Sequence, residues 1–161
     1  MTQKITLEEK IVDILTKNNI AYDVFEHDPV YTNPDMAEAL GVDENETVKS
    51  MVAETSENNM IVIVLPGNHR IDWKLTARCA GTKKITFARP EMVPPAVGCE
   101  VGCVPPFGHE TSLPVFMSPA LGYNEYLYFN PGVHNKSFKI RFTDLKTLCN
   151  PVMLTGGGED A

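Results

Sequence analysis

The chain has 161 residues, of which 43% are hydrophobic and 22% are charged, and this predicts a single domain with a hydrophobic core. No apolar run approaches the ~20 residues that a membrane-spanning helix needs, and the polar N-terminus has no signal-peptide pattern, so we expect a cytoplasmic protein without a membrane partner. The net charge of −7 argues against a protein that coats nucleic acid broadly.

The N-terminal half predicts two helices and three strands. Thr6 and Glu9 form a capping-box pattern, and apolar residues at helical spacing continue this helix to about Asn18. Pro34 at a first helical position and Gly41 as a terminator delimit a shorter second helix. The expected strands cover residues 22–26, 48–54 and 60–65, and the third, which is apolar throughout, is expected at the centre of a sheet.

The C-terminal half continues the alternation of helices and strands. The expected elements are a helix over 72–80, a strand over 84–88, a helical turn over 90–97, strands near 115–117, 126–129 and 137–142, and a helix over 143–149. Gly81 ends the first of these helices, Pro94-Pro95 cuts the turn, and Thr143 caps the last helix. The fold class is therefore α+β, or mixed α/β, in one domain over residues 1–150, and residues 151–161 are expected to be a flexible tail.

The segment Gly98–His109, GCEVGCVPPFGH, has the composition of a rigid loop. Proline lacks a backbone N–H and fixes φ, so Pro105-Pro106 cannot continue a helix or a central strand. The glycines permit a positive φ or a close approach of the backbone to another group. Rigid loops held by a scaffold are frequent sites of binding and catalysis, so this loop is the first candidate for function.

Lys49 is the second candidate. In the expected strand over 48–54 it shares a face with Met51 and Ala53, while Val48, Ser50 and Val52 point the other way. A lysine on a small, apolar face is either an edge-strand residue that reaches solvent, or a cation that opens into a pocket and binds a phosphate or carboxylate. The pattern leaves both interpretations open.

A second basic feature is the segment 67–90, which has six Lys/Arg residues against one acidic residue, Asp72, and therefore a charge of +5. Residues 1–66, in contrast, have a charge of −9. The basic segment could contact a few phosphates, or it could be a solvated helix face followed by a charged turn.

His109 closes the glycine-proline loop and is either a general base near neutral pH or a donor that holds the loop in shape. A second special loop, Asn130–Asn135, offers amide and imidazole groups to a ligand but also fits an ordinary hairpin turn. Cys99 and Cys103 with His109 allow a weak zinc interpretation, because structural zinc sites usually have two close pairs of ligands. No nucleophile elbow, phosphate-binding loop, dinucleotide fingerprint or zinc-protease motif is present, so the sequence predicts recognition of a ligand rather than attack by a protein nucleophile.

Five segments, in this order, resemble the YbaK/prolyl-tRNA synthetase-associated domain, a family of free-standing and inserted aminoacyl-tRNA editing domains. They are FEHDPVYT (25–32), ALGVDENETVKSMV (39–52), VIVLPGNHRID (62–72), VGCVPPFGH (101–109) and NPGVHNKSFKI (130–140). Together they cover most of residues 20–148, and VKSMV and GxVPPFGH are the most specific of the motifs.

The resemblance implies a mixed, barrel-like β-sheet flanked by helices, and a trans-acting hydrolase that cleaves the ester of mischarged tRNA. Lys49 matches the signature lysine of the family, which is thought to hold the acceptor (CCA) end of the tRNA, and is the expected catalytic residue. The glycine-rich loops are expected to bind a small mischarged amino acid through Gly102, Val104, Pro105, Pro106, Phe107, Gly108, His109, Asn130, Gly132, His134 and Ser137. Water or a group of the substrate itself assists the attack in this family, so neither a metal nor a cofactor is implied. An aminoacyl-tRNA synthetase is a further partner that the resemblance suggests.

Two features depart from the family pattern. Cys103 stands where a small residue without a thiol is more usual, and we expect its side chain to line the pocket. Pro94-Pro95 interrupt a segment that is usually helical. The alternative function is a non-catalytic module of the same fold that binds the tRNA acceptor end or a synthetase, and a thiol or zinc protein built on Cys99, Cys103 and His109 is a third.

Overall fold

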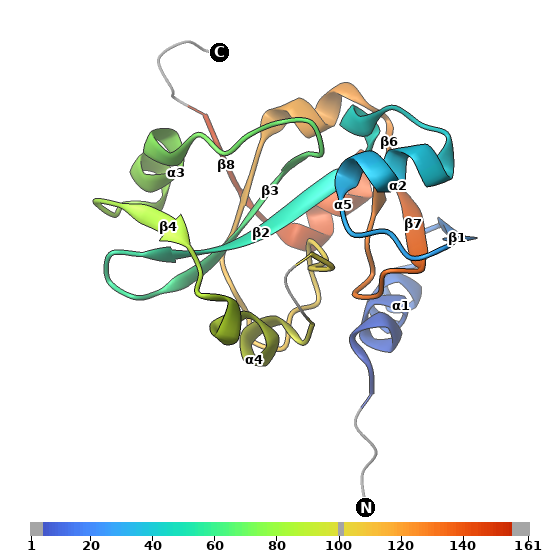
Figure 1. Ribbon diagram of the computed structural model, residues 1–161, viewed down its shortest axis with the longest axis horizontal. Coiled ribbons are helices and arrows are strands. Elements are labelled where there is room, and N and C mark those ends of the chain that lie inside the picture. Colours follow the sequence, from blue (N-terminus) through green and yellow to red (C-terminus); the bar gives the residue numbers. More distant parts are fainter. Residues whose placement is uncertain (1–4, 100–101, 156–161) are drawn as a thin grey trace, which may run out of the picture.

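The computed structural model describes residues 5–99 and 102–155, and helices alternate with strands through this part of the chain (Figure 1). The α-helices are α1 (Leu7–Lys17), α2 (Asn33–Leu40), α3 (Trp73–Ala80), α4 (Val93–Val97) and α5 (Phe142–Cys149). The strands are β1 (Tyr22–Glu26), β2 (Val48–Thr55), β3 (Met60–Pro66), β4 (Ile85–Phe87), β5 (Val115–Met117), β6 (Tyr126–Phe129), β7 (Lys136–Arg141) and β8 (Val152–Met153). Short 3₁₀ turns are η1 (Glu44–Glu46), η2 (Pro90–Met92) and η3 (Pro119–Tyr123).

The predicted helix starts and stops are confirmed where the capping chemistry is local. The Thr6 hydroxyl accepts a hydrogen bond from the Glu9 N–H, and the Glu9 carboxylate accepts one from the Thr6 N–H, which completes the capping box of α1. The Gly41 backbone ends α2 in the left-handed region, with a φ of 70°.

The segment after β4 differs from the prediction. Pro94 and Pro95 do not cut a helix there, because they occupy the first turn of α4, and this helix ends at Gly98 with a φ of 102°. The first N–H groups of a helix have no partner within the helix, so proline costs little at these positions.

The C-terminal elements also differ in detail from the prediction. Helix α5 begins one residue before Thr143, and Arg141 is its N-cap. The segment expected to be a flexible tail from residue 151 forms strand β8, which pairs with β5 through Val152 and Met153. Residues 156–161 lie outside the described part of the chain.

The described strands form two sheets. One is antiparallel with the order β1-β7-β6, and the other has the order β4-β2-β3-β5-β8 with β3 at its centre, as the sequence predicts. In the larger sheet β4, β2 and β3 are antiparallel, whereas β5 pairs parallel with both β3 and β8. A bridge between Thr47 and Tyr128 joins the two sheets. The fold is therefore the expected mixed α/β domain, although these sheets do not close into a barrel.

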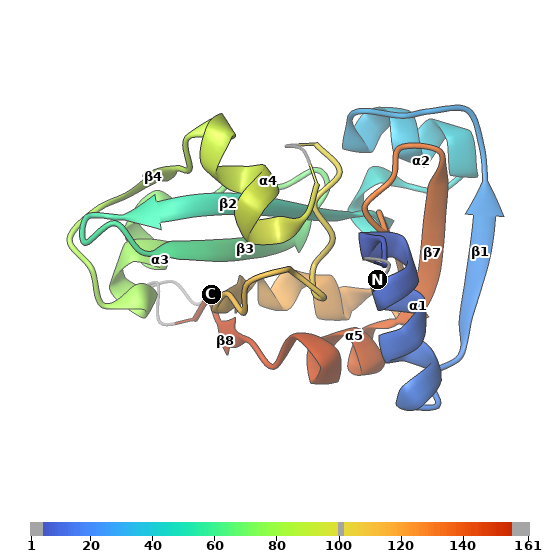
Figure 2. The ribbon, with the colours of Figure 1, turned by 90° about the horizontal axis from the view of Figure 1, so that it is seen from below.

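Helices cover both sheets and separate the interior into several clusters. The largest cluster packs α1 and α5 against β6 and β7, and Figure 2 shows α1 lying beside β7. Helix α3 covers one face of the larger sheet, while α4 packs on the other face, where Figure 2 shows it over β2 and β3. Helix α2 packs through Met36 on Val30, which lies between β1 and α2, and on Tyr128 of the smaller sheet. No helix in the described ranges is long and apolar enough to cross a membrane.

Candidate functional site

A cavity of about 710 Å³ lies along the edge of β2. One wall comes from residues 30–34 and Met36, which cover the approach to α2 and its first turn. Another comes from the segment of β4 and η2 that contains Phe87, Ala88 and Pro90. Val48–Val52 form the floor, and Gly102 and Val104 contribute from the glycine-proline loop. Residues from several separate parts of the chain therefore meet around one space.

The edge of β2 is open where it borders this cavity. Strand β3 pairs with β2 along residues 48–54, but β4 pairs with β2 only along residues 53–55. The carbonyl groups of Val48 and Val52 point away from β3, because they accept hydrogen bonds from Asn33 Nδ2 (3.2 Å) and the Ala88 N–H (3.0 Å). Alternate residues of an antiparallel strand share their direction, so the N–H and C=O of Ser50 also point to the open edge.

Ser50 adds a side chain to these backbone groups. Its hydroxyl lies on the cavity wall, is buried, and has no hydrogen-bond partner within the described part of the chain. Buried polar atoms are almost always paired in native proteins, so an unpaired hydroxyl here indicates a position at which a ligand can bind.

Lys49 lines the same cavity and is half-buried. Burial lowers the pKa of its ammonium group, the nearby Glu44 carboxylate opposes this shift, and Arg70 adds to it. In the ranges that the structure describes, Lys49 Nζ makes neither a hydrogen bond nor a salt bridge. An incompletely solvated cation without a partner favours the binding of an anionic group.

A hydrogen-bond network fixes the start of α2 against β2 at this end of the cavity. Asn33 Nδ2 donates to Thr47 Oγ1 (2.9 Å) as well as to the Val48 carbonyl, and Thr47 Oγ1 donates to the Glu44 carbonyl (2.7 Å). A Cβ atom on Gly67 would lie 2.1 Å from Thr47 Oγ1, so only glycine fits at this position of the wall.

Much of the glycine-proline loop packs into the protein interior and not around the cavity. The Phe107 ring lies 5.5 Å from the Phe129 ring, centroid to centroid, in the main core. His109 is buried, and its Nε2 donates to the Pro105 carbonyl at 2.7 Å, since a carbonyl oxygen only accepts. Burial lowers the pKa of His109, and Lys10 adds to the effect while the bond to Pro105 opposes it. His109 therefore holds the loop in shape, which is one of its two sequence-based interpretations.

The second loop, Asn130–Asn135, contacts residues of the cavity wall. Asn130 lines the cavity, and its side-chain oxygen accepts a hydrogen bond from the Gly132 N–H at 2.8 Å. His134 Nδ1 donates to the Val30 carbonyl at 3.1 Å, and its ring lies 4.4 Å from the Tyr31 ring. Ser137 is fully buried and pairs with His27 Nε2 at 2.8 Å.

The structure thus brings some of the predicted site residues together and separates others. Lys49, Gly102, Val104 and Asn130 line the cavity. The remaining residues of the predicted set do not line it: Pro105, Pro106, Phe107, Gly108, His109, Gly132, His134 and Ser137. Cys103 is buried and is not among the residues that line this cavity, so a role for its thiol in the pocket stays a prediction. Cys99, Cys103 and His109 form no metal-binding cluster, and no other such cluster occurs in residues 5–99 and 102–155.

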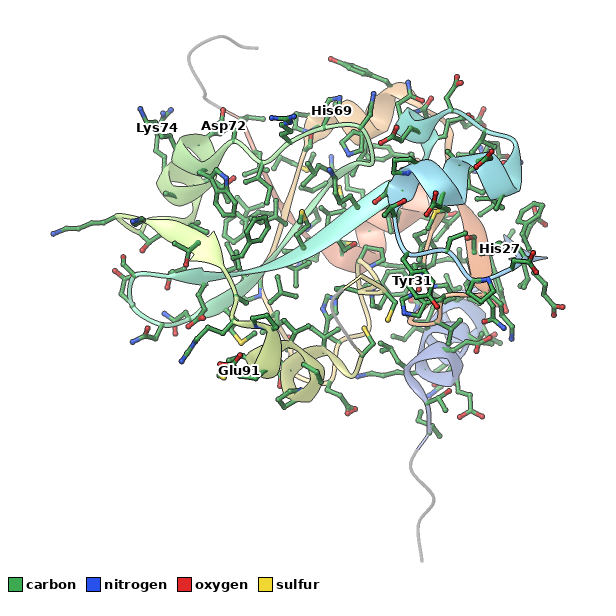
Figure 3. The ribbon with its side chains drawn as sticks, viewed as in Figure 1. His27, Tyr31, His69, Asp72, Lys74 and Glu91 are labelled. Atoms are coloured by element: carbon green, nitrogen blue, oxygen red, sulfur yellow. The ribbon has the colours of Figure 1, made fainter. Side chains whose placement is uncertain are left out.

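Sequence reasoning missed several lining residues. Tyr31, Asn33, Ser50, Gly67 and Phe87 all lie on the wall. Figure 3 shows Tyr31 beneath α2, while His69, Asp72 and Lys74 lie along another edge of the molecule. Among the missed lining residues, Tyr31, Ser50 and Gly67 lie inside the resembling segments and Asn33 directly follows one of them, which is the signal that could have found them. Phe87 lies outside all five segments.

Comparison of the sequence with known proteins gives one family. The sequence model of the aminoacyl-tRNA editing domain matches residues 27–148. EbsC of Enterococcus faecalis, whose name proposes a Cys-tRNA(Pro)/Cys-tRNA(Cys) deacylase, is 26% identical over 83 residues, which cover 52% of this chain and 51% of EbsC. The proline–tRNA ligase of Thermodesulfovibrio yellowstonii is 26% identical over 137 residues, which cover 76% of this chain and 23% of the ligase. The chain therefore spans about half of one curated relative and about a quarter of the other.

Solved structures share the fold. A protein described as a proposed trans-editing enzyme for prolyl-tRNA synthetase superposes with a TM-score of 0.82 at 23% identity, over 94% of this chain and 96% of that protein. The hypothetical protein APE2540 superposes with a TM-score of 0.83 at 22% identity, over 89% of this chain and 96% of that protein.

Proposed function

The chain belongs to the aminoacyl-tRNA editing domain family, and we propose that it is a trans-acting deacylase that hydrolyses the ester of mischarged tRNA. The observation that supports this most is a single cavity in which Lys49 lies beside the open edge of β2. A cation, a row of backbone hydrogen-bonding groups and apolar walls suit a ligand that combines phosphate, an ester and a small side chain.

Lys49 is the proposed contact for the acceptor end of the tRNA. Its ammonium supplies a compact positive charge for a phosphate or ribose oxygen of the terminal nucleotides. The net charge of −7 disfavours a larger contact with RNA, but it tolerates an enzyme that touches only the CCA end. Binding at the acceptor end also brings the ester to the strand edge.

The proposed reaction is hydrolysis assisted by the substrate. A water oxygen attacks the ester carbonyl carbon, and backbone N–H donors at the edge of β2 and around Gly102 stabilise the oxyanion, an effect typically worth about 3 kcal/mol for one donor. The bond from this carbon to the ribose oxygen then breaks, and the ribose oxygen takes up a proton. That proton comes from the attacking water and is relayed through the adjacent ribose hydroxyl or through the amino group of the amino acid. The products are a free amino acid and uncharged tRNA.

This scheme uses neither a protein nucleophile nor a metal ion. Placement of the reacting groups supplies much of the rate, because effective molarities for well-oriented groups reach roughly 10⁵ M or more. We propose small amino acids such as Ala, Cys, Ser or Pro as the mischarged group. The similarity to a proline–tRNA ligase makes tRNA(Pro) the first acceptor to test, and a synthetase a candidate partner.

The Lys49→Ala variant tests this proposal. We expect its deacylation rate on mischarged tRNA to fall about a hundredfold or more, while its circular dichroism spectrum and Tm stay close to those of the wild type. Lys146→Ala, which removes an exposed lysine of α5 outside both the cavity lining and the basic segment 67–90, is the matched control and should keep full activity. The same assay with a chelator should give an unchanged rate for the wild type.

Two outcomes would count against the proposal. Full activity in the Lys49→Ala variant would remove this residue from its proposed role. Tight binding of charged tRNA by the wild type without any turnover would favour the alternative, a non-catalytic module that binds the tRNA acceptor end or a synthetase.

A further inference from the structure

Tyr31 is an exposed aromatic residue at the mouth of the cavity. Its side chain lines the cavity, yet 64% of the residue is open to solvent. The proposed chemistry at the ester does not use it. An exposed ring that borders a binding site is therefore available to a part of the ligand that remains outside the cavity.

The ring of Tyr31 packs against the ring of His134. The His134 ring lies 4.4 Å from it, centroid to centroid, at an interplanar angle of 38°. His134 is in turn fixed by its Nδ1 donor on the Val30 carbonyl, and the Val30 N–H donates to the His134 carbonyl at 2.9 Å. Two loops that are distant in sequence thus present Tyr31 as a supported flat surface, which reduces the conformational entropy lost when a ligand stacks on it.

Tyr31 lies at the end of the cavity that holds Lys49. Asn33, two residues further along, binds the Val48 carbonyl at this end, whereas the other exposed aromatic of the wall, Phe87, lies opposite Ala53. Val48 and Val52 are four residues apart in an extended strand, or about 13 Å, so the two aromatic residues mark opposite ends. The Tyr31 end combines a ring with a cation, and the Phe87 end is apolar through Ala88, Val93 and Val104.

We propose that Tyr31 is the stacking surface for the terminal adenine of the tRNA, and that His134 positions it. This inference rests on the proposed function, because the adenine is attached to the same ribose that carries the ester. A base on that ribose must lie close to the ester, and the supported Tyr31 ring lines the same cavity as Lys49. Cationic sites lined by exposed aromatic side chains are the usual arrangement for unpaired nucleotides, whose bases stack on the rings.

The test uses an uncharged hairpin RNA with a single-stranded CCA 3′ end, in which 2-aminopurine replaces the terminal adenine. Stacking quenches the fluorescence of 2-aminopurine, so the signal reports the proposed contact directly. We expect quenching with the wild type and with Tyr31→Phe, which keeps the ring. With Tyr31→Leu, which keeps only apolar bulk, we expect the quenching to disappear and the Kd to rise about tenfold.

Tyr123→Leu is the matched control. Among the described large hydrophobic residues Tyr123 is the most exposed, at 88%. It does not line the cavity, and its replacement should change neither signal nor Kd. Equal quenching and equal Kd for Tyr31→Leu and the wild type would overturn the inference, as would a wild type that does not bind the RNA.

The RNA probe is uncharged, so this result does not depend on hydrolysis. Deacylation of mischarged tRNA is measured separately on the same variants. If the protein deacylates mischarged tRNA but Tyr31→Leu changes neither the 2-aminopurine quenching nor the Kd, the adenine contact alone would be refuted. Quenching that depends on Tyr31 in a protein without deacylase activity would refute the proposed function alone.

Discussion

Ser50 brings a hydroxyl into the cavity next to Lys49, and among the described residues that hydroxyl has no hydrogen-bond partner. A buried polar group left unpaired costs about 1–3 kcal/mol. The fold therefore retains this serine at the expense of its own stability. A ligand that pairs with the hydroxyl would recover the loss, and we propose that the ester or the ribose of the substrate does so.

The Ser50→Ala variant separates stability from activity. Removal of the unpaired hydroxyl should leave the Tm unchanged or raise it, by about 2–4 °C for each kcal/mol recovered in a domain of this size. The kcat/KM for deacylation should fall about tenfold, which corresponds to one lost hydrogen bond to the substrate. Thermal denaturation and deacylation kinetics measure both effects. A lower Tm together with full activity would contradict this account of Ser50.

The sequence indicates Lys49 but not its neighbours on the wall. A lysine that alternates with small and apolar residues stands out in any strand, so the pattern itself marks position 49. The unpaired state of Ser50 depends on which edge of β2 lacks a partner, and the role of Asn33 depends on a contact with Val48 from another element. These are tertiary facts, and no local pattern contains them.

At the scale of elements, the short length of β4 creates the site. Because β4 pairs with β2 only along residues 53–55, the remaining edge of β2 is free to border a cavity. An exposed strand edge invites pairing with other chains, and proteins often cover such edges with loops or helices. Here α2 and the segment after β4 flank the edge and leave the cavity between them.

A charged pair holds the wall that follows β4 against β2. Arg89 donates from Nε and Nη2 to the two oxygens of Glu54, each at 3.1 Å, and the Arg89 N–H donates to Glu54 at 3.4 Å. These hydrogen bonds from Arg89 lower the pKa of the Glu54 carboxyl against the opposing effect of burial. The pair thereby connects β2 to the segment that includes Ala88 and Pro90.

The Glu54→Gln variant should be less stable than the wild type at neutral pH, with a Tm lower by about 2–4 °C. A carboxyl with a lowered folded-state pKa contributes stability above its ordinary value of 4.5 and loses it as the pH falls through the lower folded-state value. The difference in Tm should therefore shrink as the pH falls through 4.5 and vanish at lower pH. Glu125→Gln, at the exposed pair with Arg141, is the control and should change little at any pH. A Tm difference for Glu54→Gln that persists in strong acid would contradict the assignment.

Elements with local signals are those that the sequence predicts well. The caps of α1 and α2 and the apolar run of β3 are local, and the structure confirms them. The wrong expectation for Pro94-Pro95 has a physical reason, because proline breaks a helix interior but is favoured in a first turn. The sequence does not show that the helix begins as late as Val93.

At the scale of the whole molecule, charge is distributed unevenly. Residues 67–90 have a charge of +5 within a chain of net charge −7, so the remaining residues sum to −12. Part of the basic segment has internal roles, since Arg89 binds Glu54 and Arg70 lies close enough to Lys49 to lower its pKa. Contact between RNA and the rest of this segment stays a prediction.

The arrangement of the two sheets decides which predicted site residues can meet. The order of the helices and strands and the fold class can be predicted from the alternation of these elements in the sequence and from the family resemblance. The sequence does not show that Phe107 and His109 lie away from the cavity, because both belong to a continuous motif whose residues are expected to act together. Packing divides that motif, and only Gly102 and Val104 of the predicted loop residues reach the cavity wall.

We propose that the protein hydrolyses the ester of a mischarged tRNA in this cavity. The most direct test measures release of the amino acid by the purified wild-type chain across a panel of tRNAs charged with Ala, Cys, Ser or Pro, each correctly and incorrectly paired. We predict rapid release from at least one mischarged tRNA, little release from the correctly charged ones, and loss of the release in the Lys49→Ala variant. Release at the spontaneous rate from every member of the panel would contradict the claim.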